Sequence, residues 1–289
     1  MNFTKMQGAG NDFILVEAGN ISHDWSQMTV AMCNRHFGIG ADGLLLVLPS
    51  DIADFQMRIL NPDGSEAEAC GNGLRCLARY VVDTGLANAG AQEISIETAA
   101  GIRIVKIYRA TGKLDKIQVG MGKPKLGAKD IPVVIEPGLV DIKPMLSYSI
   151  AMGTKELLLN FVSMGNPHAI YFWQHPVSDF PLSELGPEVE QHKIFPNRVN
   201  FEVARILSRQ QIETRVWERG VGETLACGSG ACAVAVAAQL LGYIDNKVEI
   251  KLPGGILDVE WDRVGEVLLS GPAEIVFSGD WPDKGRLSR

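Results

Sequence analysis

The sequence predicts an α+β protein of two pseudo-symmetric halves that arose by internal duplication, each half a β-barrel-like sheet around one central helix. Three observations predict this fold class. The chain contains a long internal repeat, each half contains short alternating apolar runs, and a helical segment follows the same Cys-Gly-X-Gly motif in both halves. The length of 289 residues agrees with two domains, at about 150 residues per domain.

The repeat relates three pairs of segments that follow one another in the same order. RILNPDGSEAEACGNG at 58–73 resembles RVWERGVGETLACGSG at 215–230 without a gap. Upstream, KMQGAGNDFILV resembles VSMGNPHAIYF, and downstream ISIETAAGIRI resembles VEIKLPGGILD. The offsets are 157, 155 and 154 residues, so order and spacing are kept across half of the chain. Collinear matches of this kind indicate a duplicated domain.

Strands and helices follow from local patterns. An apolar segment that stops before a glycine follows each Cys-Gly-X-Gly motif and predicts a helix, from Leu74 to about Asp83 and over Ala231–Leu241. The second helix is apolar on nearly every side, so we expect it to be buried inside its half. Strands are predicted by short runs rich in β-branched residues, namely Phe13–Val16, Leu44–Val47, Gln56–Leu60, Ile94–Glu97 and Ile102–Ile107.

Residues 123–145 are rich in Pro and Gly and are the expected crossover between the halves. We therefore expect an N-terminal half of residues 1–122 plus 273–289 and a C-terminal half of residues 123–272. The active site is expected in the cleft between them.

Composition and charge exclude several classes of protein. The net charge of −7 argues against nucleic acid as the main partner, because phosphate contacts require clustered Lys and Arg. The N-terminal segment lacks the apolar run of a signal peptide, and the most apolar stretch, Ala231–Leu241, is too short to span a bilayer. Five cysteines, an odd number, fit a reducing compartment. We expect a cytoplasmic protein that binds neither nucleic acid nor membranes.

The repeat separates the five cysteines into two groups. Only Cys70 and Cys227 occupy equivalent positions, and we expect the unmatched Cys33, Cys76 and Cys232 to be small buried residues. The cysteine spacings lack the Cys-x2-Cys clip of zinc sites and no cluster of histidines adjoins them. No metal is therefore expected.

Cys70 and Cys227 each stand directly before Gly-X-Gly at the predicted N-terminus of a helix. The free N–H groups and the positive end of the helix dipole are expected there to lower the pKa of a thiol and to bind a carboxylate or phosphate. If the halves face each other, the two helix ends meet in one cleft. A thiolate on one face of an α-carbon and a thiol on the other can then invert that centre. The alternative is two glycine-rich helix caps with incidental cysteines.

At these residues the sequence resembles the diaminopimelate epimerase family, and the resemblance covers nearly the whole chain. It is carried by KMQGAGNDFI, FGIGADG, NPDGSEAEACGNGLRC, VSMGNPHAI, VWERGVGETLACGSGACA and GPAEIVFSG. The resemblance implies two β-barrel domains with a central helix each and an active site between them. It also implies an isomerase without a cofactor that interconverts LL- and meso-diaminopimelate in lysine biosynthesis, with a small diamino-dicarboxylate as its partner.

The resemblance assigns roles by position. Cys70 and Cys227 match the acid/base pair, and His168 falls near the site. Glu218 and Arg219 are suited to the distant charged end of the substrate, because charged groups give a specificity that an apolar pocket does not. The substrate-binding positions implied are Asn11, Asn61, Gly71, Asn72, Asn166, Asn200, Glu218, Arg219, Gly228 and Ser229.

Alternatives remain at this point. Local capping of turns is an equal explanation for the Asn and His residues when they are considered without the family. Gly43 departs from relatives that carry a Gln reaching the substrate, so that contact is in doubt here. A proline or hydroxyproline racemase is the nearest rival, although its first motif looks like MCGHG rather than ACGNG. A rival from another class is a thiol redox or anion-binding protein. Two further hypotheses are that the chain forms a homodimer and that Cys70 and Cys227 can form an inactivating disulfide.

Overall fold

The computed structural model describes residues 1–19, 23–67, 70–88, 90–111, 113–134, 144–152 and 155–282. The chain forms two compact units, Met1–Val119 together with the segment from Gly271 onward, and Gly120–Ser270. Parts of the expected crossover (135–143) and of the expected N-terminal half (283–289) lie outside the described residues.

The N-terminal unit is built on one sheet. Its strands lie in the order β18-β1-β2-β3-β4-β6-β7-β8, with the short β5 beside β4. The pairs β2–β3 and β4–β6 are parallel and the others are antiparallel. The strands are β1 (Asn2–Gly8), β2 (Asn11–Glu17), β3 (Gly43–Leu48), β4 (Phe55–Leu60), β5 (Glu66–Ala67), β6 (Glu93–Thr98), β7 (Gly101–Ala110), β8 (Lys113–Gly120) and β18 (Glu274–Asp280).

The C-terminal unit repeats this arrangement. Its order is β9-β10-β11-β12-β13-β15-β16-β17, with β14 beside β13, and the parallel pairs are β11–β12 and β13–β15. The strands are β9 (Tyr148–Met152), β10 (Lys155–Ser163), β11 (Pro167–Phe172), β12 (Asn200–Ser208), β13 (Gln211–Glu218), β14 (Gly222–Thr224), β15 (Lys247–Leu252), β16 (Gly255–Glu260) and β17 (Leu268–Gly271).

The pairing of individual residues repeats as well. Between β3 and β4, Leu44 pairs with Leu60, and between β12 and β13 the pair 157 residues later is Phe201 with Trp217. The β6–β7 and β15–β16 pairs also share one register, with an offset of 154 residues. Register depends on where each side chain is buried, so this agreement confirms the predicted duplication. The five predicted runs are confirmed as parts of β2, β3, β4, β6 and β7.

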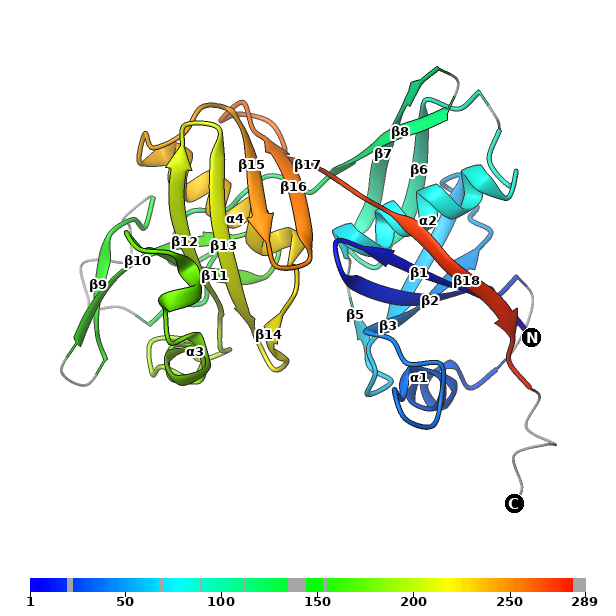
Figure 1. The fold of residues 1–289 in the computed structure, drawn as a ribbon, viewed down its shortest axis with the longest axis horizontal. Helices are drawn as coiled ribbons and strands as arrows, with labels where there is room; N and C mark the ends of the chain where they lie inside the picture. The colour runs from blue at the N-terminus through cyan, green and yellow to red at the C-terminus, as the bar shows by residue number, and fades with distance from the viewer. Residues whose placement is uncertain are drawn as a thin grey trace. The chain divides into compact units, whose positions relative to one another are not determined.

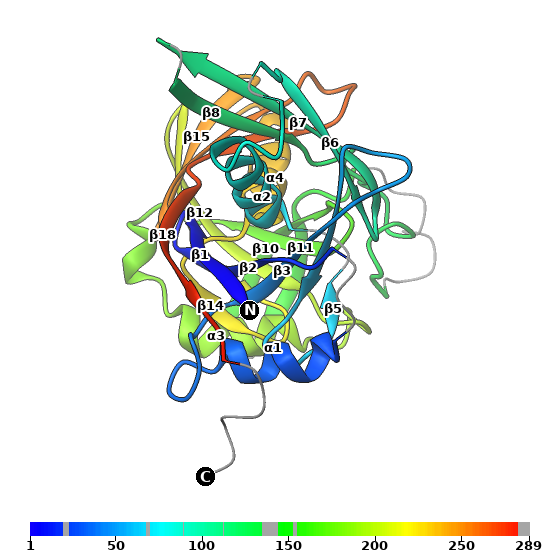
Figure 2. The same cartoon turned by 90° about the vertical axis from the view of Figure 1, so that its right-hand side faces the viewer.

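Each unit packs its strands around one helix, as predicted. Helix α2 (Gly71–Asp83) contacts β1, β2, β3, β4, β7 and β18, and Figures 1 and 2 show it lying among these strands. Helix α4 (Gly228–Leu240) contacts β10, β11, β12, β15 and β16. All residues from Ala231 to Gln239 are buried, which confirms the expectation drawn from their apolar character.

Both helices begin three residues earlier than predicted, because their first residues are Gly-Asn-Gly and Gly-Ser-Gly, which are poor helix formers. Two further helices were not predicted. They are α1 (Trp25–Cys33), between β2 and β3, and α3 (Leu182–Glu190), at the equivalent place between β11 and β12, after a short 3-10 turn, η1 (Val177–Asp179). No helix in the described part of the chain is long and apolar enough to cross a membrane.

A charged cluster stabilises the start of the N-terminal unit. Asp12 contacts Lys5 Nζ at 2.5 Å and Arg35 Nη2 at 2.7 Å, and Arg35 Nη2 also contacts Asp42 at 2.7 Å. Burial alone would raise the pKa of Asp12, but hydrogen bonds from Arg35, Lys5 and Asp42 outweigh it and lower that pKa to about 2. The cluster joins β1, β2 and the segment before β3.

We predict that Asp12→Asn destabilises the fold in a pH-dependent way. An unfolded Asp titrates at about 3.9, so the stability that ionised Asp12 contributes is present above that pH and is lost as pH falls through about 2. The variant should lose about 1 to 2 kcal/mol at neutral pH, and its difference from the wild type should shrink as the medium is acidified. Urea unfolding at several pH values measures this, with the exposed Asp51→Asn as control. A loss that does not change with pH would contradict the assignment.

Candidate functional site

The two equivalent cysteines are the N-caps of α2 and α4. The backbone is extended at both residues: φ and ψ are −142° and 118° at Cys70 and −121° and 115° at Cys227. The carbonyl of each accepts the first helical hydrogen bond, from Leu74 N and from Ala231 N, at 2.9 Å. The first N–H groups of a helix have no carbonyl partner inside it, and in α4 one of them, Gly230 N, donates to Cys227 Sγ. Glycines stand on either side of Asn72 and Ser229, and the space beside Gly73 and Gly230 is taken by the side chains of Leu45 and Glu202.

In the N-terminal unit, amides connect the cysteine to charged groups. The Cys70 thiol donates to Asn11 Oδ1 at 3.9 Å, and Asn72 Nδ2 donates to the same oxygen at 3.1 Å. Asn11 Nδ2 in turn donates to Asp42 Oδ2 at 2.8 Å, while Asn72 Oδ1 accepts from Arg75 Nη2 at 2.7 Å. Arg75 is fully buried and was not among the predicted site residues. Predicted positions 11, 70, 71 and 72 therefore lie together.

In the C-terminal unit, a second chain of hydrogen bonds leads away from the cysteine. Cys227 Sγ accepts from Gly230 N at 3.4 Å and lies 3.5 Å from Ser229 Oγ. Asn166 Nδ2 donates to Ser229 Oγ at 3.3 Å, and Asn166 Oδ1 lies 3.0 Å from His168 Nε2. These predicted positions also form one group.

Glu202 continues this chain and was missed by the sequence reasoning. Its Oε1 lies 2.7 Å from His168 Nδ1, and both side chains are fully buried. A signal was available, because the repeat aligns Glu202 with Leu45, at an offset of 157 residues. A carboxylate where the other half carries an apolar residue indicates a role other than packing.

Glu218 is a further carboxyl beside Cys227. Thr224 Oγ1 donates to Glu218 Oε1 at 2.5 Å, and a side-chain hydrogen bond connects Glu218 with Cys227. Burial raises the pKa of Glu218, and the nearby Glu202 adds to that rise. This carboxyl is therefore easier to protonate than an exposed one.

The expectation that the helix N-terminus lowers the thiol pKa is wrong for Cys227. Burial raises the pKa of Cys227 well above its usual range, and the negative charges of Glu218 and Glu202 raise it further. Hydrogen bonds from Ser229 and Gly230 lower it, but by less. In this state Cys227 is a thiol, that is, a proton donor.

Three predicted substrate-binding residues use their side chains within their own unit. Asn61 Nδ2 donates to Ser65 Oγ at 3.0 Å. Asn200, which is buried, donates to the Pro167 carbonyl at 2.9 Å and accepts from Arg219 N at 2.9 Å. Arg219 is exposed, and its Nη1 donates to the Asn197 carbonyl at 3.2 Å. The Asn61 contact is of the local capping kind that the sequence left as an alternative, whereas Asn200 bonds residues 33 and 19 positions away.

Gly43 lies opposite Phe13 in the β2–β3 pair, as Asn200 lies opposite His168 in β11–β12. A Cβ on Gly43 would stand 2.9 Å from the Leu60 carbonyl oxygen. A side chain at this position therefore requires the backbone of β4 to shift.

The three unmatched cysteines are buried, as expected. Burial raises the pKa of Cys33 and of Cys76 to about 12, so neither thiol ionises readily. None of the five cysteines, all of which the structure describes, forms a disulfide bond. Among the described residues, no group of three or more His, Cys, Asp or Glu is arranged to hold a metal ion.

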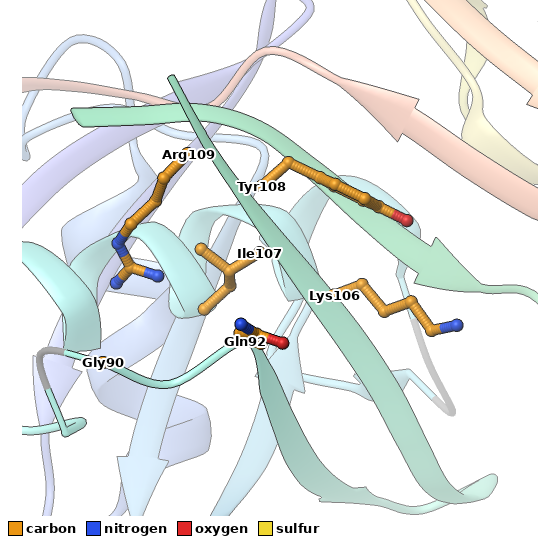
Figure 3. A pocket seen from close by; sticks show the side chains of 6 residues that line it. All are labelled: Gly90, Gln92, Lys106, Ile107, Tyr108 and Arg109. Atoms are coloured by element: carbon orange, nitrogen blue, oxygen red, sulfur yellow. The ribbon is translucent and has the colours of Figure 1, made fainter. Parts of the chain in front are cut away.

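A cavity of about 400 Å³ lies at β7 in the N-terminal unit, away from the residues predicted for the site (Figure 3). Its two cations are engaged, since Arg109 Nη1 donates to the Ala91 carbonyl at 2.7 Å and Lys106 lies 3.8 Å from Glu93. The cavity is lined by Gly90, Gln92, Lys106, Ile107, Tyr108 and Arg109.

A sequence model of the family described as diaminopimelate epimerase matches residues 3–127 and 160–276. The chain is 45% identical over 285 residues to a diaminopimelate epimerase of Pelotomaculum thermopropionicum, a match that covers 98% of this chain and 99% of the relative. It is 46% identical over 285 residues to one of Moorella thermoacetica, with the same coverage.

Solved structures with this fold are more distant in sequence. A hydroxyproline epimerase from Agrobacterium vitis with bound trans-4-hydroxy-L-proline superposes with a TM-score of 0.66 at 16% identity, over 96% of this chain and 90% of that one. A phenazine biosynthesis protein of Bacillus anthracis gives 0.67 at 18% identity, over 96% and 98%. At such identities the likeness shows the fold alone.

We predict that Gly230→Ala is more harmful than Gly73→Ala, its equivalent in the other unit. A Cβ on Gly230 would stand 2.7 Å from Glu202 Oε1, whereas one on Gly73 would stand 3.1 Å from the end of the flexible Leu45 side chain. Gly230→Ala should lower the free energy of unfolding by about 1 to 3 kcal/mol, while the better helix propensity of Ala offsets the milder contact at Gly73. Urea unfolding compares the two. Equal stability would mean that Glu202 is not held against the first turn of α4.

Proposed function

The chain belongs to the diaminopimelate epimerase family, and we propose that it interconverts LL- and meso-diaminopimelate by two-base proton transfer, in which the thiolate of one of Cys70 and Cys227 removes the α-proton and the thiol of the other delivers a proton to the opposite face of the carbon. The protein is an isomerase, and the reaction belongs to lysine biosynthesis. The observation that carries the proposed chemistry is that each duplicated unit starts its central helix with a cysteine N-cap.

Inversion at a carbon requires a base on one face and an acid on the other. Two thiols perform both tasks, and their roles exchange when the reaction runs in reverse. The raised pKa of Cys227 supports its starting as the protonated partner. In the proposed reaction the thiolate of Cys70 removes the α-proton of one isomer while Cys227 delivers its own proton to the opposite face. For this to happen, both units must hold the same substrate molecule.

The carboxylate next to the reacting carbon is the group that most needs stabilisation. Negative charge moves onto it as the α-proton leaves, and N–H groups at a helix N-terminus stabilise such charge. We assign this role to the backbone of positions 71, 72, 228 and 229. Because those amides are fixed by the helices, they need no reorientation during proton transfer.

The second amino-acid end of the substrate gives selectivity. The exposed Arg219 is a ligand for the distant carboxylate, and the ammonium group fits the carboxyl of Glu218 and the amide oxygens of the site. The equivalent positions in the N-terminal unit are Asn61 and Pro62, which carry no charge. We infer that the units share the chemistry and that the C-terminal unit provides the charged recognition. We also infer that the enzyme acts in the cytoplasm.

Incubation with LL-diaminopimelate in heavy water tests the proposed function. The meso isomer should form and deuterium should enter at one α-carbon, because only one end reacts. Proline, the substrate class of the structurally similar racemases, should show no exchange. Exchange of proline in place of diaminopimelate would assign the chain to that class, and no exchange with either compound would favour a non-enzymatic thiol protein.

We predict that Cys70→Ala and Cys227→Ala each abolish epimerisation, since each removes the proton carrier on one face of the carbon. Loss of general acid–base catalysis reduces the rate by about 10²- to 10⁴-fold. Cys76→Ala and Cys232→Ala, at buried positions in the same helices, should keep most of the turnover and lose about 1 kcal/mol or more of stability. Comparable losses of activity in all four variants would contradict this separation of the cysteines.

A further inference from the structure

The space beneath the first helical turn is filled differently in the two units. In the N-terminal unit, Leu45 lies against Gly73, and both Leu45 and Phe13 are buried apolar residues. In the C-terminal unit, Glu202 takes the place of Leu45 against Gly230. The strand pairing confirms this equivalence, since Leu15 pairs with Leu45 on β2–β3 and Ile170 pairs with Glu202 on β11–β12.

His168 is the equivalent of Phe13 by the same pairing. His168 pairs with Asn200 on β11–β12, and Phe13 pairs with Gly43, the equivalent of Asn200, on β2–β3. The fold therefore accepts an apolar pair at this place, and the C-terminal unit carries a buried carboxyl and imidazole instead. A buried ion pair is often no more stabilising than apolar residues of similar volume. Its presence here indicates a role in the chemistry.

The hydrogen-bond partners determine where the protons lie. His168 Nδ1 faces Glu202 Oε1 at 2.7 Å and Nε2 faces Asn166 Oδ1 at 3.0 Å, so both ring nitrogens meet oxygen atoms that accept. The other carboxylate oxygen, Glu202 Oε2, has no hydrogen-bond donor among the described residues. Among the described residues, the imidazole of His168 is therefore the group that can carry a positive charge opposite the Glu202 carboxylate. The first turn of α4, against which Oε1 lies, also favours a negative charge.

We propose that Glu202 is a positioning residue that holds His168 as an imidazolium and thereby sets the direction of the hydrogen bonds leading to Cys227. The imidazolium donates to Asn166 Oδ1, which turns the amide nitrogen of Asn166 toward Ser229. Ser229 Oγ accepts from that nitrogen, so its own hydrogen points to Cys227 Sγ, 3.5 Å away. A hydroxyl that donates to sulfur stabilises the thiolate left when Cys227 gives up its proton.

The N-terminal unit gives its equivalent amide the opposite direction. Asp42 takes the amide nitrogen of Asn11, so the oxygen of Asn11 faces Cys70 and Asn72. The amide beside Cys70 therefore presents an acceptor to its thiol, whereas the amide of Asn166 leads through Ser229 to a hydroxyl donor at Cys227, whose thiol also bonds the Glu218 carboxyl. This inference rests on the proposed function, because it explains how the two thiols are made unequal for proton transfer.

In this arrangement the direction of the hydrogen bonds between Glu202 and Cys227 depends on one proton of the His168 ring. If the ring loses a proton while Glu202 is a carboxylate, the remaining proton stays on Nδ1 and Nε2 becomes an acceptor. Asn166 then has to reverse, and Ser229 donates to Asn166 instead of Cys227. The other titratable groups that face this chain are Glu218 on β13 and Cys227 itself, and both are included in any pH profile.

Nitrogen NMR of protein labelled in its five histidines tests the protonation directly. His168 is assigned by its absence in His168→Phe, and the exposed His36 ring is the control signal in the same spectrum. At the pH of the activity assay, both ring nitrogens of His168 should carry protons in the wild type, and one should lose its proton in Glu202→Gln. A bare ring nitrogen in the wild type at that pH would overturn the proposal.

Enzyme kinetics distinguish a positioning role of His168 and Glu202 from a role in packing alone. The double variant His168→Phe/Glu202→Leu copies the apolar pair of the N-terminal unit, so it should fold with unchanged urea stability. Its kcat should nevertheless fall about 10- to 100-fold, as expected from losing a charged hydrogen-bond chain, while KM changes little. In Glu202→Gln, the alkaline limb of kcat/KM should move, because the neutral ring is free to keep its proton on Nε2. A double variant with normal kcat, or a Gln variant with the wild-type pH profile, would overturn the proposal.

Different results would contradict the proposed function and the proposed role of Glu202. If wild-type protein exchanges no α-proton of diaminopimelate, the proposed function is wrong, whatever the ring spectrum shows. If it exchanges normally and His168 has a bare nitrogen, only the role of Glu202 is wrong.

Discussion

The first turn of a helix leaves its backbone N–H groups without partners inside the helix, and every functional feature of this chain depends on two such turns. Each unit packs its strands around one helix, α2 or α4, and starts that helix with a cysteine followed by two glycines that flank one polar residue. Gly73 and Gly230 make room for Leu45 and Glu202 of their own units, and the cysteine caps the helix. A carboxylate held by these amides would have a thiol beside its α-carbon, which is the geometry that α-proton transfer requires.

Duplication explains why there are two such turns, and later divergence explains why they are not equal. Strand order, parallel pairs and much of the register agree between the units, so the scaffold was kept. The polar groups beside the two cysteines differ. Asn11 is tied to Asp42 in one unit, and Asn166 is tied to His168 and Glu202 in the other. A reaction that needs an acid on one face and a base on the other benefits from this inequality.

Much of the fold could be predicted because it follows local rules. The repeat indicated the duplication, alternation indicated the strands, and the glycine after each apolar segment indicated where α2 and α4 end. The starts of these helices were placed late, because glycine is a weak helix former and the capping role of Cys70 and Cys227 is not a matter of propensity. Helices α1 and α3 were missed, since neither follows a motif of the repeat.

The site was harder to predict because burial and long-range pairing decide it. Glu202 stands 34 residues after His168, and only the parallel pairing of β11 with β12 brings the two together. The pKa of Cys227 was expected to fall, and it rises because burial and two carboxylates outweigh the helix end. A sequence comparison of the two halves could have indicated Glu202, because Leu45 takes its place in the other half.

The most direct test of the two-thiol account is where deuterium appears early in the reaction. In heavy water, the thiol that removes the α-proton can return that same proton to the starting isomer, whereas the opposite thiol supplies solvent deuterium to the product. The account predicts that, at low conversion of LL-diaminopimelate, the meso product is labelled and the remaining LL isomer is not. Equal labelling of both isomers from the earliest times would show that one base serves both faces and would contradict the account.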